Sequence, residues 1–225
     1  MIIECGSGWR NSVDIGQWKK YKKNTLLFYK NKLPYKAKQF NFIFPLHSYF
    51  EEMIGNKKEV FIADFGAGLF STTGSTWNGV NIQLYPSDIL ADEFRLLLKD
   101  ASVVPIIPVE KQNMAELTYR DNFFDIVHCV NALDHCADPL KSLLEMYRVC
   151  KLEGYMYLKH FYNNAEYERY KGFHQWNICK TENDDCLIWG KEDKILLSDY
   201  FDKFNIDIET DSNDREIIII KILKE

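Results

Sequence analysis

The sequence has no apolar run of about 20 residues, the length that a helix needs to cross a bilayer. It has no excess of basic residues either, since 28 Lys and Arg stand against 33 Asp and Glu, with a net charge of −5. General affinity for nucleic acid needs a basic face that displaces counterions. We therefore expect neither a membrane protein nor a nucleic-acid-binding protein.

Cysteine motifs are also missing. The six cysteines form no CxxC pair and no Cys/His cluster with zinc spacing, so the sequence predicts no metal site. Two of them, Cys129 and Cys150, fall in a predicted strand and a predicted helix, where a reduced thiol packs as a small apolar group. The first ten residues, MIIECGSGWR, lack the basic and apolar regions of a signal peptide. We therefore expect reduced thiols and a cytoplasmic location.

Internal repeats, low-complexity tracts and Pro/Gly/Ser linkers are absent, and 225 residues suit one α/β domain. From residue 60 onward predicted strands and helices alternate, as they do in a parallel sheet with helices on both faces. Helices are expected over residues 89–99 and 194–204, and from the cap Asp138-Pro139 to Gly154. The expected strands span residues 60–63, 80–85, 103–109, 124–130 and 155–161.

The end of the chain is expected to form a hairpin from residues 204–209 and 216–223. Its second strand is too apolar for a sheet edge, so we expect it between two neighbours. The main domain is expected over residues 59–225. A helical extension over residues 1–58 precedes it, and residues 163–193 form an insertion within it. Loops after the carboxyl ends of strands surround the ligand crevice of a doubly wound sheet. Both regions are therefore candidates for a lid.

The segment EVFIADFGAGLF, residues 59–70, joins a buried strand to a glycine turn at Gly66 and Gly68. The missing Cβ atoms let a ligand lie against the backbone. Ser71 replaces the third glycine of a dinucleotide-binding GxGxxG motif, and no P-loop lysine follows. Downstream stand Asp88, after a second apolar stretch, then FFDIVHCVNALDHCADP and MYRVCKLEGYMYLKHF. In this order the four segments resemble class I S-adenosylmethionine-dependent methyltransferases, over less than half of the chain.

This resemblance implies a Rossmann-like methyltransferase fold: an α/β, doubly wound, mostly parallel seven-stranded sheet with an antiparallel C-terminal hairpin and a helical N-terminal extension. It implies S-adenosyl-L-methionine as the cofactor and methyl transfer as the activity. The chain departs from the family after the glycine turn, where LFSTTGSTWNG is poor in helix-forming residues. The first helix of the fold must therefore be very short or replaced by a loop.

The resemblance also implies a set of cofactor contacts. Asp88 is expected to accept hydrogen bonds from the two ribose hydroxyls, or alternatively to cap the helix that follows it. Asp64 is expected to orient the loop that contains Gly66 and Gly68 by accepting backbone N–H bonds, with the methionine end of the cofactor as a secondary partner. The other expected contacts are Asn113 and Met114 on the adenine, and Asn131 and Ala132 on the methionine end.

A methyl transferase must align its acceptor and remove a proton from it, because the sulfonium already activates the methyl group. His135, His160 and His174 are the candidate general bases, while His47 and His128 are expected to be structural. We predict methyl transfer to an oxygen or nitrogen of a small polar metabolite or saccharide precursor, without a metal ion. The alternatives are a catalytically silent scaffold with the same fold and a module that only binds a nucleotide-containing ligand.

Overall fold

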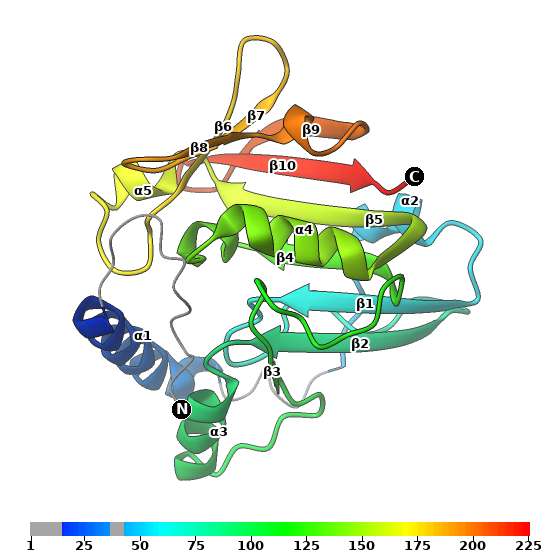
Figure 1. Cartoon of the computed structure of the whole chain (residues 1–225). Helices are drawn as coiled ribbons and strands as arrows, with labels where there is room; N and C mark the ends of the chain where they lie inside the picture. The colour runs from blue at the N-terminus through cyan, green and yellow to red at the C-terminus, as the bar shows by residue number, and fades with distance from the viewer. Residues whose placement is uncertain (1–14, 37–42) are drawn as a thin grey trace.

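A computed structural model describes residues 15–36 and 43–225, and its centre is a seven-stranded sheet (Figure 1). The strand order is β3-β2-β1-β4-β5-β10-β9. Only β10 opposes the other six strands of this sheet: it pairs antiparallel with both β5 and β9. The strands are β1 (Glu59–Phe65), β2 (Asn81–Asp88), β3 (Glu110–Lys111), β4 (Phe124–Val130), β5 (Cys150–Phe161), β9 (Phe204–Thr210) and β10 (Glu216–Leu223). The predicted fold, with a buried antiparallel strand near its end, is confirmed.

Helices and a second sheet surround this one. The helical segments are α1 (Ile15–Lys36), η2 (Ser48–Phe50), α2 (Glu51–Ile54), α3 (Ala91–Asp100), η3 (Leu133–His135), α4 (Pro139–Val149), α5 (Asn164–Tyr167) and η4 (Leu197–Asp199). The second sheet is antiparallel and contains β6 (Asn177–Lys180), β7 (Cys186–Trp189) and β8 (Lys194–Leu196). The insertion after β5 therefore contributes α5 and two strands of this second sheet.

Both faces of the main sheet are buried, because successive side chains of a strand point to opposite faces. In β1, Ala63 and Phe65 belong to a core that also includes α4 and the second sheet. Val60 and Ile62 point the other way and pack against η2 and α2. The apolar pattern of β1 on both faces therefore reflects its central place in the sheet.

Several predicted boundaries agree with the structure and three do not. The strand predicted over residues 124–130 coincides with β4, and the closing hairpin is present as β9 and β10. The strand predicted over residues 103–109 is wrong: this segment is a loop, and only Glu110–Lys111 pairs with β2. Pro105 and Pro108 explain the difference, because proline has no N–H for the strand ladder.

The predicted helix over residues 194–204 is also wrong, since β8 and η4 occupy this segment. Gly154 does not end a helix: α4 ends at Val149 and Gly154 lies within β5. A Cβ at Gly154 would lie 2.9 Å from the carbonyl oxygen of Asp125 on the neighbouring strand β4. The glycine therefore permits close approach of two strands.

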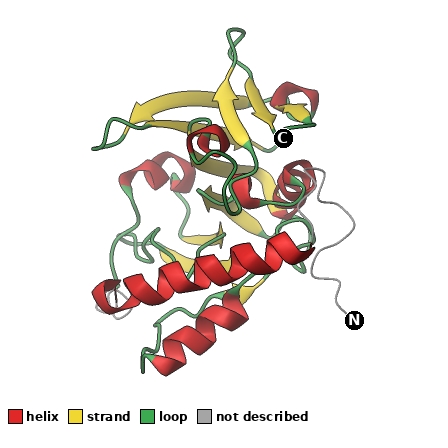
Figure 2. Cartoon of the chain, turned by 90° about the vertical axis from the view of Figure 1, so that its left-hand side faces the viewer, coloured by secondary structure: helices red, strands yellow, loops and turns green. Residues whose placement is uncertain are grey.

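The long helix α1 lies across the front of the molecule in Figure 2, at the side of the sheet where the parallel strands end. Trp18 and Leu33 of α1 pack in one cluster with Leu90, Phe94 and other residues around α3. The helical prediction for residues 1–58 is confirmed where the structure describes this region; its remaining residues lie outside the described part. None of the described helices is long and apolar enough to cross a membrane.

Candidate functional site

A cavity of about 740 Å³ lies at the carboxyl ends of the parallel strands. Gly66 after β1, Asp88 at the end of β2, Asn131 after β4 and Phe161 at the end of β5 line it. On the side of α1, the residues that line it are Trp18, Tyr21, Asn24, Thr25, Phe28 and Tyr29. The volume is typical of small-molecule sites, and the place is where doubly wound sheets bind their ligands.

The glycine turn after β1 has the backbone shape that the sequence predicts. Gly66 and Gly68 have φ angles of +78° and +68°, in the region that glycine adopts without steric cost. A Cβ at Gly66 would lie 2.2 Å from the Cβ of Ala132, and one at Gly68 would lie 2.6 Å from the hydroxyl of Tyr29. Both glycines line tightly packed space: Ala132 packs against Gly66 at the cavity wall, and the side chain of Tyr29 from α1 packs over Gly68.

Asp88 joins the end of β2 to this turn. Its Oδ2 accepts a hydrogen bond from the backbone N–H of Gly68 at 3.0 Å, and its Oδ1 accepts one from Leu90 at 2.8 Å. Burial raises the pKa of Asp88 to about 6, although the two backbone hydrogen bonds act in the opposite direction. Each carboxylate oxygen keeps a second lone pair, so ligand hydroxyls can still bind here.

Asp64 is not placed as expected, and the prediction that it orients the glycine loop is wrong. Its side chain is 5% exposed, and its Oδ1 lies 2.7 Å from Nδ1 of His128. The other ring nitrogen of His128 lies 3.0 Å from the hydroxyl of Tyr49, so the structural role predicted for this histidine is confirmed. Alternation along β1 turns Asp64 toward the sheet face beside η2 and away from the turn. Asp88 holds the turn instead.

The four residues predicted to contact the adenine and the methionine end all line the cavity. Asn113 Oδ1 accepts the N–H of Ala115 at 3.1 Å, and Asn131 Oδ1 accepts the N–H of Phe161 at 3.1 Å. These bonds fix the two amide side chains and leave their NH₂ groups as donors. The four residues are Asn113, Met114, Asn131 and Ala132.

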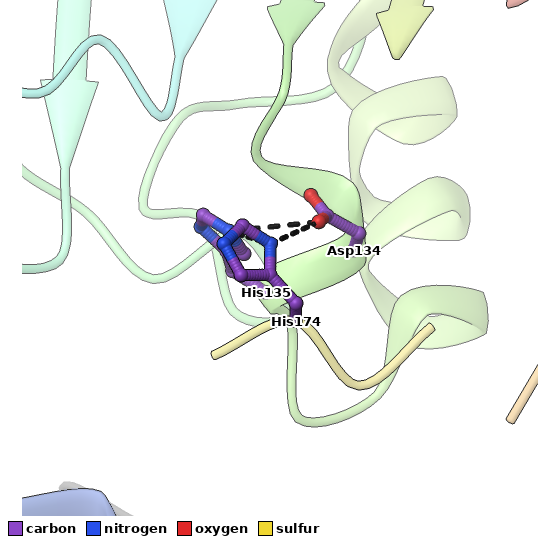
Figure 3. Close-up of side chains that lie close together, drawn as sticks. All are labelled: Asp134, His135 and His174. Carbon is purple, nitrogen blue, oxygen red and sulfur yellow. Dashed lines mark hydrogen bonds and ion pairs between the residues drawn. The ribbon is translucent and has the colours of Figure 1, made fainter. Parts of the chain in front are cut away.

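At one end of the cavity Asp134, His135 and His174 meet, and we call these three residues the histidine cluster (Figure 3). His174 Nδ1 lies 2.8 Å from Asp134 Oδ2 and 2.9 Å from His135 Nε2. Asn164 donates a hydrogen bond from Nδ2 to the same carboxylate oxygen at 2.8 Å. The 3₁₀ turn η3 after β4 supplies the first two residues, and the loop after α5 supplies His174.

The charges within the cluster depend on one another. Burial alone would raise the pKa of Asp134, but His135 and His174 hold it well below its ordinary value. Burial lowers the pKa of His135, and the neighbouring His174 lowers it further while Asp134 opposes the shift. Asp134 is therefore a buried anion at neutral pH, and His135 is a neutral imidazole.

His160 belongs to a different environment from the other two candidate bases. Its side chain is 1% exposed and does not line the cavity, and burial lowers its pKa to about 4. His135 and His174, in contrast, line the cavity and have side chains that are 36% and 30% exposed. Burial therefore removes His160 from the candidates for direct contact with an acceptor in the cavity.

Sequence reasoning missed Arg215, which also lines the cavity. Its guanidinium lies 3.7 Å from the ring centroid of Phe161 and 4.1 Å from that of Tyr167, and it donates a hydrogen bond to Asn164 Oδ1 at 2.8 Å. Among the described residues it makes no ion pair. The antiparallel direction of β10 was the available signal, because it brings the amino end of this strand to the carboxyl end of β5.

Tyr29 and Asp134 were missed as well. Tyr29 sits over Gly68, and burial together with the charge of Asp88 raises the pKa of its hydroxyl to about 12. No pattern in the sequence of α1 indicates this contact. Asp134 precedes His135 directly after a predicted buried strand, and that position at a strand's carboxyl end was the signal that could have found it.

Known protein families and solved structures include similar domains. A family of methyltransferase domains matches residues 63–158. A stretch of 99 residues is 32% identical to the uncharacterized protein MJ0638 of Methanocaldococcus jannaschii, covering 44% of this chain and 40% of that protein. The match thus spans less than half the length of this relative.

Two solved structures show the likeness of the fold. One is a candidate S-adenosyl-L-methionine-dependent methyltransferase from Methanococcus maripaludis, with 11% identity over 91% of this chain and 94% of that one, and a TM-score of 0.50. The other is the [4+2]-cyclase SpnF, with 13% identity over 90% of this chain and 96% of that one, and a TM-score of 0.51. Together with the domain matched over residues 63–158, the strand order and these two structures show that the chain has the Rossmann-like fold of S-adenosylmethionine-dependent methyltransferases.

Proposed function

We propose that this protein transfers the methyl group of S-adenosylmethionine to an oxygen or nitrogen of a small polar acceptor held in the cavity. The observation that supports this most is the pairing of His174 with the buried carboxylate of Asp134 at the cavity wall. A carboxylate that holds one imidazole nitrogen leaves the other nitrogen to act as a general base. In this proposal Nε2 of His174 takes the proton of the acceptor.

The residues present fit the cofactor. Gly66 presents backbone without a side chain at the cavity wall, and Asp88 offers carboxylate lone pairs at the carboxyl end of β2. When bound, S-adenosylmethionine supplies an activated methyl group. The chain then has to hold the acceptor in line with it, which contributes about 7 kcal/mol or more of rate acceleration in well-oriented reactions. Helix α1 and Phe173 cover the cavity in this proposal and exclude water from it.

The end of the cavity beside Arg215 supports a polar acceptor. Arg215 is fixed between Phe161 and Tyr167, and Asn164 links it to Asp134. A fixed guanidinium that makes no ion pair within the described part of the chain suits a carboxylate, a phosphate or several hydroxyl groups. A saccharide precursor with an anionic group is therefore the acceptor class that we propose.

A labelled-cofactor screen tests the proposed function. Purified protein is incubated with methyl-labelled S-adenosylmethionine and fractions of small metabolites, and S-adenosylhomocysteine is measured alongside the label. Label in a small-molecule product supports methyl transfer. Tight cofactor binding without S-adenosylhomocysteine in any fraction would favour a module that only binds a nucleotide-containing ligand. Absence of cofactor binding would favour the silent scaffold and overturn the proposal. Because the similar structure SpnF is named a cyclase, S-adenosylhomocysteine formation is the deciding product.

Asp88 gives the proposal a pH signature. Its pKa of about 6 lies above the ordinary carboxyl value, so the free protein gains a proton at this site as the pH falls below 6. A neutral carboxyl accepts weaker hydrogen bonds from the ribose. We expect S-adenosylmethionine affinity, measured by isothermal titration calorimetry, to be about tenfold lower at pH 5 than at pH 7.5.

The matched control is Asp88→Asn, which keeps the size of the side chain and cannot ionise. Its affinity should be lower by about 1.5–3 kcal/mol at neutral pH and should no longer fall between pH 7.5 and pH 5. A variant that keeps normal affinity but melts at a lower temperature would show that Asp88 only holds the turn and the start of α3. An unchanged pH profile in the variant would contradict the assignment.

A further inference from the structure

The histidine cluster brings three metal-ligating side chains to one point of the cavity wall. One oxygen of Asp134, one nitrogen of His135 and one nitrogen of His174 lie within 4.8 Å of one another. We propose that these three residues bind a divalent transition-metal ion of the zinc class. The sequence alone predicts no metal site, because these residues have no recognisable ligand spacing along the chain.

The distances among the three atoms suit a bound ion. His174 Nδ1 is 2.8 Å from Asp134 Oδ2 and 2.9 Å from His135 Nε2, and the third edge of the triangle is 3.5 Å. Ligands at 2.0–2.1 Å from zinc are separated by about 2.9 Å in octahedral geometry and about 3.4 Å in tetrahedral geometry. The triangle therefore has the size of one face of a metal coordination shell.

Hydrogen bonding alone does not satisfy this cluster. His174 Nδ1 faces the carboxylate of Asp134, which only accepts, and Nδ2 of Asn164 at 2.9 Å, which only donates. With a proton on Nδ1, His174 can donate to Asp134, but this N–H then faces the N–H donor of Asn164. Without that proton, Nδ1 can accept from Asn164, but its lone pair then faces the carboxylate of Asp134. His135 Nε2 is the third neighbour of His174 Nδ1, and a hydrogen bond between these two nitrogens needs a proton on one and a lone pair on the other. A cation at the centre lets the carboxylate and both imidazoles present lone pairs together.

Two further observations support a ligand at this point. Among the described residues, Asp134 Oδ1 is a buried oxygen without a hydrogen-bond partner, on a side chain that is only 3% exposed. Behind the cluster, Asn164 donates to Asp134 Oδ2 and accepts from Arg215, which fixes the orientation of its amide. Such outer hydrogen bonds orient the ligands of metal sites.

The ligand set indicates the kind of ion. Two imidazoles and one carboxylate suit zinc and neighbouring first-row metals, whereas magnesium prefers oxygen ligands and retains its water. Three protein ligands leave coordination positions open, as in catalytic rather than structural sites. The half-exposed sides of His135 and His174 face the cavity, so these positions open toward it.

This placement has a consequence that rests on the proposed function. An acceptor hydroxyl at an open position would lose its proton to water at neutral pH, because a bound divalent ion lowers the pKa of a coordinated hydroxyl. Its oxygen then forms the bond to the methyl carbon as the bond from that carbon to the cofactor's sulfur breaks. With the ion bound, water would thus accept the acceptor's proton in place of Nε2 of His174.

The test is titration of tag-free, chelator-stripped full-length protein with Zn²⁺ and with Mg²⁺, followed by calorimetry. We expect one Zn²⁺ per chain with micromolar or tighter affinity and no measurable Mg²⁺ binding. His135→Gln, His174→Gln and Asp134→Asn should each weaken Zn²⁺ binding by about 100-fold or more. The matched control is His47→Gln, since His47 is exposed and lies outside the cluster; this variant should bind Zn²⁺ like the wild type.

Titration with Co²⁺ identifies the ligands by absorption. Visible absorption bands of bound Co²⁺ without a charge-transfer band from a thiolate support binding at the histidine cluster. A thiolate charge-transfer band would place the ion on a cysteine and overturn the proposal. Absence of Zn²⁺ binding by the wild type, or wild-type Zn²⁺ affinity in all three variants, would also overturn it. S-adenosylmethionine binding is measured on the same samples. If only Zn²⁺ binding fails, the metal site is wrong and the proposed function stands. If only cofactor binding fails, the proposed function is wrong and the metal site stands.

Discussion

Replacing Gly66 with valine is expected to abolish S-adenosylmethionine binding and to lower the melting temperature of the protein. A Cβ at this position would lie 2.2 Å from the Cβ of Ala132, and the φ of +78° is strained for any residue with a side chain. The backbone strain costs about 1–2 kcal/mol, and the crowding adds about 1–3 kcal/mol. Because Ala132 also lines the cavity, relieving this contact would displace the cavity wall. Calorimetry with S-adenosylmethionine and thermal unfolding measure the two effects.

Gly79 provides the matched control, because its φ is +71° and a Cβ there would meet nothing within 4 Å. Gly79→Ala therefore measures the backbone strain alone and should leave cofactor affinity unchanged. Gly66→Ala combined with Ala132→Gly relieves the contact but keeps the strain, so it should recover part of the stability lost in Gly66→Ala. Near-normal cofactor affinity in Gly66→Val would contradict the assignment of the turn.

What could be predicted from the sequence is mostly local. The apolar segment Phe124–Val130 is uniform enough to place a central strand, and Ile217–Ile220 is too apolar for a sheet edge. The positive φ values of Gly66 and Gly68 follow from a turn that only glycine adopts without cost. The absence of a helix over residues 66–80, all of which the structure describes, follows from a segment poor in helix formers.

Side-chain partners far apart in the sequence could not be predicted. Asp64 and Asp88 both lie near the end of a strand. Asp64 nevertheless contacts His128 on β4, whereas Asp88 accepts a hydrogen bond from the glycine turn. Which acid turns toward the loop depends on the register of the strands and on the face that each residue occupies. The sequence contains both residues but not the contact that separates their roles.

Tertiary packing also overrides local preference at the edges of the domain. Residues 194–204 have the apolar spacing of a helix, but Ile195, Leu197 and Phe201 join the same core as the second sheet, and β8 pairs with β7. Arg215 shows the same principle at the site. Its place in the cavity depends on the direction of β10 and on the rings of two neighbours from other segments.

Replacing His174 with alanine is expected to reduce turnover by about 100-fold or more while S-adenosylmethionine affinity stays within about threefold. The imidazole lines the end of the cavity and contacts the buried carboxylate of Asp134 at 2.8 Å, whereas the glycine turn and Asp88 belong to other strands. Loss of the ring therefore removes the group that takes the acceptor's proton, directly or through a bound ion, and leaves the cofactor contacts in place. Turnover is measured as S-adenosylhomocysteine formation with the acceptor from the screen.

His47→Ala is the control for the loss of an imidazole elsewhere, because His47 is exposed and its Nε2 lies 3.0 Å from the carbonyl oxygen of Thr72. It should retain turnover. Asp134→Asn keeps a side chain of the same size beside His174 but loses the charge, so it should lower turnover without changing cofactor affinity.

Full activity of His174→Ala would move the role to His135 or show that the acceptor needs no base. Lost cofactor affinity in that variant would instead make the loop of His174 a structural part of the cavity roof, because its neighbour Phe173 packs against Trp18 and Tyr21 of α1.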